Sequence, residues 1–205
     1  TAQRVAAHDP FFAGNVDALI AAQPKDLEAS EIEVRLGATW LDKKYIEQFM
    51  YETFETPRYL RGQIEISYVP YTAEWQVSRK SMVRYNDVAA FTTYGTDRAS
   101  AYRLLEDALN LRDIRIYDTI EDADGRERRV LNAKETTLAA QKQQLIRDAF
   151  KDWIWKDPER RETLVRQYNE EMNSTRPREY DGSHIVFSGM NSEITLREHQ
   201  KNAIA

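Results

Sequence analysis

The chain has 205 residues and a formal net charge of −5, and its 41% hydrophobic residues with few Gly and Pro exclude collagen-like, low-complexity and wholly disordered proteins. It contains no Cys, which excludes disulfides, thiolate metal sites and cysteine nucleophiles, and its three widely separated His offer little for a metal site. No apolar run reaches the roughly 18 residues of a membrane span, and no secretory leader opens the chain, so we expect a cytoplasmic protein with no membrane partner.

The first third of the chain predicts two amphipathic helices. Apolar residues recur at spacings of three and four between Pro10 and Gln23, which is typical of a short helix. Asp42 is placed to cap a second helix that ends before Pro57, because the residue preceding a proline is disfavoured in helical conformation. The buried stripe expected on this second helix is Tyr45, Ile46, Phe49, Met50 and Phe54.

The apolar period then changes from helical to alternating. Residues 64–68 and 74–79 alternate around a turn near 70–73, which predicts a β-hairpin. A helix follows from Asp97, and its expected inward residues are Ala101, Leu104, Leu105, Ala108 and Leu109. A second hairpin is predicted around Asp124-Gly125, with Ile114, Ile116 and Ile120 on its first strand and residues 128–131 on its second.

Asn132 and Glu135 form a capping pair that opens a long helix, which we expect to end near Trp155. Its expected buried residues are Leu138, Leu145, Ala149, Phe150 and Trp153. Asp157-Pro158 then starts another helix, with a stripe of Leu164, Val165, Tyr168 and Met172, and we expect the two helices to pack as an antiparallel hairpin.

After Asn173 the chain becomes polar and irregular. We expect a short strand over 184–188, and a last helix opened by Thr195 and Glu198. This helix runs to the last residue, which indicates a segment cut from a longer polypeptide.

The predicted fold class is α+β, with two short antiparallel β-hairpins packed with helices, a long helical hairpin and a trailing C-terminal helix. The predicted divisions are an α+β domain at 1–131, the helical hairpin at 132–173, and a loop, strand and lead-in helix at 174–205, joined in one compact unit.

Basic residues concentrate between 126 and 178, whereas residues 1–57 are acidic. Clustered arginines can pair with phosphates, and Tyr180 follows one cluster in the polar stretch, where loop residues often serve function rather than packing. The alternative is that the clusters are solvated helix faces and ion-pair partners. The candidate DNA contacts are Arg126, Arg128, Arg129, Arg160, Arg161, Arg176, Arg178 and Tyr180.

Motifs that carry catalysis are absent. The chain contains no P-loop, no GxGxxG, no HExxH and no GxSxG. We therefore assign no catalytic residue, no metal ligand and no resident cofactor.

Several runs of residues together resemble a known family. They are Glu33–Trp40, Tyr45–Phe49, Asn132–Thr136, Tyr168–Glu170, Arg176–Gly182, Phe187–Asn191 and Leu196–Gln200. As a set they resemble the region just upstream of the motor in very large Swi/Snf-like superfamily-2 helicases. Phages and conjugative elements carry these helicases, which are often fused to an adenine-specific DNA methyltransferase and are described as DarB-like antirestriction proteins.

The resemblance implies that Gln200 is a Q-motif-like adenine contact once the motor is attached. It also implies that ATP with Mg²⁺ and S-adenosylmethionine belong to the parent protein and not to this segment. The resulting hypothesis is a non-catalytic accessory domain that engages DNA or braces neighbouring helicase and methyltransferase modules. The alternatives are a structural spacer without DNA contact, and a nuclease or transferase whose site the motifs do not reveal.

Overall fold

The computed structural model describes residues 9, 12–83, 87–122, 125–175, 180–191 and 193–205. The chain forms two compact units, a larger one of residues 27–168 and a smaller one that combines residues 1–26 with 169–205. The predicted α+β class is confirmed, because helices occur with two small antiparallel sheets, each of two strands.

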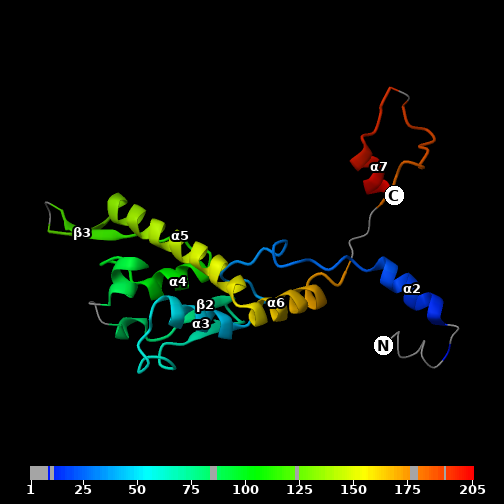
Figure 1. The fold of residues 1–205 in the computed structure, drawn as a ribbon. Coiled ribbons are helices and arrows are strands. Elements are labelled where there is room, and N and C mark those ends of the chain that lie inside the picture. The colour runs from blue at the N-terminus through cyan, green and yellow to red at the C-terminus, as the bar shows by residue number, and fades with distance from the viewer. Residues whose placement is uncertain (1–8, 10–11, 84–86, 123–124, 176–179, 192) are drawn as a thin grey trace. The chain divides into compact units, whose positions relative to one another are not determined.

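The larger unit contains both sheets and the long helices (Figure 1). Its elements in chain order are α3 (Lys43–Thr53), β1 (Ile66–Val69), β2 (Glu74–Val77), the short 3₁₀-helix η2 (Lys80–Met82), the π-helix η3 (Ala89–Thr93), α4 (Ala101–Leu109), β3 (Tyr117–Glu121), β4 (Glu127–Leu131), α5 (Ala133–Lys156) and α6 (Pro158–Glu171).

Helix α3 begins and packs as its sequence predicts. The Asp42 carboxylate accepts a hydrogen bond from the Lys44 backbone N–H, which satisfies one of the free donors of the first turn. The five residues of the expected stripe are all buried, and Phe49 and Phe54 are fully inaccessible to solvent. Phe49 contacts the ring of Phe150 edge-on, with ring centroids 5.1 Å apart, so α3 and α5 share one aromatic core.

Hairpin β1–β2 is enclosed by helix side chains. Ile66, Trp75 and Val77 are buried. The backbone N–H of Ile66 donates to Glu47 of α3 at 2.9 Å, and that of Val77 donates to Glu106 of α4 at 2.7 Å. Neighbouring helices therefore satisfy backbone groups along both strands of this sheet.

Helix α4 lies against this hairpin and confirms its predicted inward face, because the five residues expected to be buried are buried. The loop that precedes α3 passes close to the C-terminal end of α4. In this loop Gly37 has a φ of +83°. A Cβ at that position would lie 2.2 Å from the carbonyl oxygen of Leu109, so only glycine fits there.

Helix α5 buries a different stripe from the one its leucines suggest. Leu138 and Leu145 are 41% and 43% exposed, so the prediction that they are buried is wrong. The buried residues recur at helical spacing and are Ala139, Gln143, Ile146, Phe150 and Ile154. Gln143 is accommodated in this stripe because its side-chain amide donates to the Arg112 carbonyl at 2.9 Å.

A single residue, Asp157, separates the end of α5 from the start of α6, and its carboxylate caps α6 by accepting from the Arg160 backbone N–H. The helix runs on from the end of α5 and does not fold back along it (Figure 1), so the expected antiparallel packing of the two helices is not formed. Of the expected stripe, Leu164 is fully buried, whereas Met172 is 49% exposed.

The smaller unit contains α2 (Ala13–Ala22) and α7 (Glu198–Ile204). The predicted strand over 184–188 is wrong, since these residues form turns and irregular backbone. The last helix begins two residues later than predicted, because Arg197 and Gln200, and not Thr195 and Glu198, make its capping contact.

Candidate functional site

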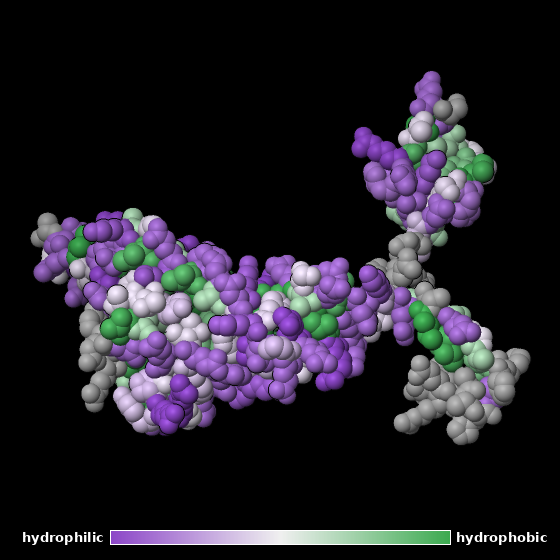
Figure 2. Space-filling view, viewed as in Figure 1, coloured by the Kyte–Doolittle hydropathy of each residue, from purple (hydrophilic) through white to green (hydrophobic). Residues whose placement is uncertain are grey.

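The hairpin β3–β4 projects from the end of the larger unit (Figure 1) and is here called the ribbon. No residue of either strand is buried, and all five residues of β4 are exposed. In the space-filling view this end of the unit shows hydrophilic and hydrophobic patches side by side (Figure 2). The first strand is shorter than predicted, because Ile114 and Ile116 are buried before it begins at Tyr117.

The register of the ribbon decides which side chains share a face. Arg128 lies opposite Ile120, and Val130 lies opposite Asp118, so these four side chains occupy one face. The pairing continues beyond the strands, because the Asp122 N–H donates to the Arg126 carbonyl at 2.9 Å. Alternation therefore also places Arg126 on this face, which we call the Arg128 face.

The opposite face of the ribbon, here called the Arg129 face, carries a different set of side chains. Arg129 lies opposite Thr119, and Glu127 lies opposite Glu121. The guanidinium of Arg129 lies over the ring of Tyr117 on the same face, 4.8 Å from the ring centroid. The three ribbon arginines are thus divided between two faces.

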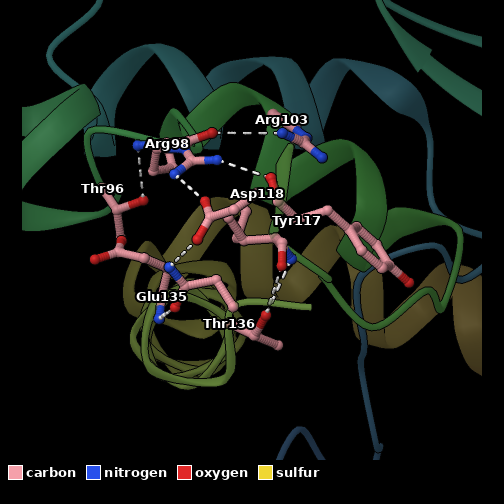
Figure 3. A network of polar contacts seen from close by, with 9 residues as sticks. Thr96, Arg98, Arg103, Tyr117, Asp118, Glu135 and Thr136 are labelled. Carbon is pink, nitrogen blue, oxygen red and sulfur yellow. Dashed lines mark hydrogen bonds and ion pairs between the residues drawn. The ribbon is translucent and has the colours of Figure 1, made fainter. Parts of the chain in front are cut away.

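A polar network fixes the base of the ribbon (Figure 3). One Arg98 nitrogen donates to the Asp118 carboxylate at 2.8 Å, and a second donates to the Tyr117 carbonyl at 2.9 Å. The Asn132 amide donates to the other Asp118 oxygen at 2.7 Å, while its own oxygen accepts from the Glu135 N–H at the start of α5. Asp118 therefore ties the ribbon both to the segment before α4 and to the start of α5.

The same network perturbs the acidity of its carboxylate. The hydrogen bond from Arg98, and next the one from Asn132, lower the pKa of Asp118 below its usual range, because both stabilise the ionised form. Asp118 is therefore ionised and paired at neutral pH.

The ribbon arginines differ from Arg98 in their partners. Within the described part of the chain, Arg126, Arg128 and Arg129 take part in no ion pair. Arg126 and all five residues of β4, Arg128 and Arg129 among them, are exposed. The three arginines are available to an anionic partner.

The second predicted arginine cluster lies at the start of α6, at a distance from the ribbon within the same unit (Figure 1). Arg160 stacks on Trp153 at 3.6 Å and donates to the carbonyls of Trp153 and Ile154 at the end of α5. Burial lowers the pKa of Arg160. This side chain joins two helices, whereas its neighbour Arg161 is exposed.

The third predicted cluster, Arg176 and Arg178, lies outside the described residues. Tyr180 is 52% exposed and lines an open pocket of about 620 Å³ together with Asp181, Glu198, His199, Asn202 and Ala203. Gln200 is exposed, and its side-chain oxygen accepts a hydrogen bond from the Arg197 N–H at 2.9 Å. Its amide group therefore caps its own helix.

Among the described residues, no group of three or more His, Asp or Glu residues is arranged to hold a metal ion. Over the same ranges, no helix combines the length and the apolar character that crossing a membrane requires.

Sequence reasoning found the ribbon arginines and the capping role of Asn132, but it missed Arg98 and Asp118. These two residues lie 20 positions apart and carry no motif. Asp118 is the second residue of β3, between Tyr117 and Thr119, and no local pattern there indicates a partner at Arg98.

Comparison with known proteins gives one match. A family model described as Domain of unknown function (DUF8437) matches residues 35–174, which is more than half of the chain and includes the whole ribbon. Neither a curated protein nor a solved structure matches.

Proposed function

The chain belongs to the DUF8437 family, and from this premise we propose that it is a non-catalytic accessory module that engages DNA through the β3–β4 ribbon. The observation that carries the proposal is the combination of a fixed base with three exposed arginines that form no ion pair with any residue that the structure describes. Arginine contacts to phosphate supply affinity with little sequence readout.

The shape of the ribbon supports a binding role over a packing role. Two strands that bury no side chain contribute little to the core. Arg98, Asp118 and Asn132 nevertheless anchor the ribbon. Ordering these side chains costs conformational entropy, and the ribbon offsets little of that cost by burial, which favours a role in binding. An anchored, exposed and charged element is suited to contact a partner.

Bracing of a neighbouring protein module is a second candidate. Ile120, Val130 and Leu131 expose 49%, 39% and 48% of their surfaces, and arginines interleaved with apolar residues are typical of protein interfaces. The net charge of −5 also favours a protein over a polyanion. Binding that is insensitive to salt distinguishes this candidate from DNA engagement.

We place the module in a cytoplasmic mobile-element protein, next to helicase and methyltransferase modules. ATP with Mg²⁺ and S-adenosylmethionine are then bound by those modules, and the amide of Gln200 turns from its capping contact toward adenine only when the motor is attached. This part of the proposal rests on the resemblance of the sequence runs described above.

Fluorescence anisotropy with a labelled DNA duplex tests the proposal. The wild-type chain is expected to bind at about 50 mM salt and to lose affinity steeply toward 200 mM. The triple variant Arg126→Gln, Arg128→Gln, Arg129→Gln is expected to weaken binding by at least roughly tenfold and to flatten the salt dependence.

The matched control is Arg35→Gln, Arg58→Gln, Arg166→Gln, which removes the same charge from exposed positions elsewhere in the larger unit. It should change affinity far less than the ribbon triple. Equal losses in the two triples, or no DNA binding by the wild-type chain, would refute DNA engagement by the ribbon.

A further inference from the structure

We propose that the ligand of the ribbon is double-stranded DNA, and that the ribbon enters a groove of the duplex with its Arg128 face toward the DNA. This inference rests on the proposed function and adds the class of nucleic acid and the orientation of binding.

The two faces differ in charge near the tip. On the Arg129 face, Glu121 and Glu127 lie directly opposite each other, so this face presents two neighbouring carboxylates. Like charges in this arrangement are unfavourable within the hairpin, and a phosphate approaching them is repelled. The tip of the Arg129 face is therefore unfavourable for binding a polyanion.

On the Arg128 face, positively charged side chains predominate near the tip. Arg126 directly precedes β4 and Arg128 lies two residues further on, with Ile120 opposite Arg128. Asp122 lies opposite Arg126, but the second acid of this face, Asp118, is held by Arg98 and Asn132. This face combines two guanidinium groups with apolar side chains, and these are the groups that contact phosphates, base edges and thymine methyl groups.

The geometry of the ribbon fits a duplex. A two-stranded antiparallel ribbon is one of the two elements that the major groove of B-DNA admits. Each strand of the ribbon has five residues, so at about 3.3 Å per residue it reaches roughly 17 Å from its base. That length is sufficient to cross a groove about 12 Å wide.

The ribbon lacks what binding of single strands requires. Unpaired bases are held mainly by stacking on open aromatic rings. Tyr117 is the one aromatic residue between positions 117 and 131, and it is half-buried with Arg129 over its ring. The ribbon therefore offers no free platform for a base.

The fixed base also matters for groove binding. Because Arg98 and Asn132 hold Asp118, the ribbon is oriented before DNA arrives, which lowers the ordering cost of binding.

The experiment compares a duplex of about 16 base pairs, roughly one and a half turns of B-DNA, with one of its strands alone. The whole chain is used, and circular dichroism with thermal unfolding confirms that each variant is folded. The expected result is duplex affinity at least about tenfold above that for the single strand.

Two variant pairs test the orientation. Arg126→Gln with Arg128→Gln should weaken duplex binding by about tenfold and reduce the salt slope by about two. Glu121→Gln with Glu127→Gln, on the opposite face, should leave duplex affinity unchanged or raise it. Arg129→Gln alone should cost less than about threefold.

Single-strand affinity equal to that for the duplex would overturn the duplex assignment. A loss with Arg129→Gln as large as with the double arginine variant would overturn the orientation. Either result leaves DNA engagement by the ribbon standing, whereas absence of any DNA binding refutes the proposed function itself.

Discussion

The two hairpins of the larger unit have the same topology and opposite environments. In β1–β2, Ile66, Trp75 and Val77 are buried, and side chains of α3 and α4 bond the backbone along the strands. In β3–β4 no side chain is buried. The first hairpin is part of the core, whereas the second is attached to the core only at its base.

The edges of the two hairpins differ in the same way. In an antiparallel pair of strands, residue pairs that are hydrogen-bonded to each other alternate with pairs whose backbone groups point outward. At the two ends of the ribbon the hydrogen-bonded pairs are Ile116 with Asn132 and Asp122 with Arg126. Thr119 and Arg129 therefore direct their backbone groups outward. An open strand edge can pair with another chain and aggregate unless charged side chains or a partner protect it. The ribbon arginines therefore also oppose aggregation of the free protein.

Matched isoleucine truncations give the largest expected effect and test whether the two hairpins differ energetically. Ile66→Ala removes a fully buried side chain and should lower the free energy of unfolding by about 2–5 kcal/mol. Ile120→Ala, at a site 49% exposed, should stay within about 0.5 kcal/mol. Urea denaturation measures both, and similar losses would show that the ribbon is part of the cooperative core.

Removal of an edge bond has the next largest expected effect. The Asn110 side chain accepts from the Trp75 N–H and donates to the Trp75 carbonyl, each at 2.8 Å. Asn110→Ala leaves both groups unpaired and should cost about 1–3 kcal/mol. Hydrogen exchange at the Trp75 amide should accelerate in this variant.

The ribbon supplies the internal comparison for that experiment. The outward amide of Thr119 should exchange rapidly in the wild-type chain and remain unchanged in Asn110→Ala. Strong protection of Thr119 in the free protein would mean that the ribbon edge is covered.

The smallest expected effect concerns the base of the ribbon. The pKa of Asp118 is lowered in the folded state, so its contribution to stability is present above the unfolded value of about 3.9 and is lost as the pH falls through the folded value. Arg98→Gln should raise this pKa toward the ordinary value, because it removes the principal hydrogen bond.

Carboxyl NMR titration measures the shift. Arg103→Gln is the matched control, because Arg103 contacts the Arg98 carbonyl and not the carboxylate. An unchanged pKa of Asp118 in Arg98→Gln would show that Arg98 does not hold the ribbon.

Local sequence signals predicted the elements whose determinants are local. Asp42 and Asn132 cap the helices they were expected to cap, and α4 buries its predicted face. The buried face of helix α5 was predicted only in part: Phe150 is buried and Ala149 and Trp153 pack against the core, whereas Leu138 and Leu145 are exposed. The polar Gln143 interrupts the true stripe, and Leu138 and Leu145 are more hydrophobic. The distant carbonyl of Arg112 makes Gln143 acceptable inside, and no local pattern contains that information.

The candidate site was predictable to the same extent. The arginines and the Asp124-Gly125 turn marked the ribbon, and Gly125 has the positive φ of 73° that such a turn requires. The sequence alone does not distinguish Arg128, whose side chain is exposed, from Arg160, whose guanidinium donates hydrogen bonds to carbonyls at the end of α5. The pairing of Arg98 with Asp118 depends on how the chain segments meet in the fold.

Amide chemical-shift mapping of the ¹⁵N-labelled chain during titration with duplex DNA tests the central claim most directly. The account predicts that the earliest and largest shifts fall on residues 119–122 and 126–130, with the core amides of α3 and α4 unmoved. Shifts confined to α6 or to the smaller unit, with the ribbon signals unchanged, would contradict it.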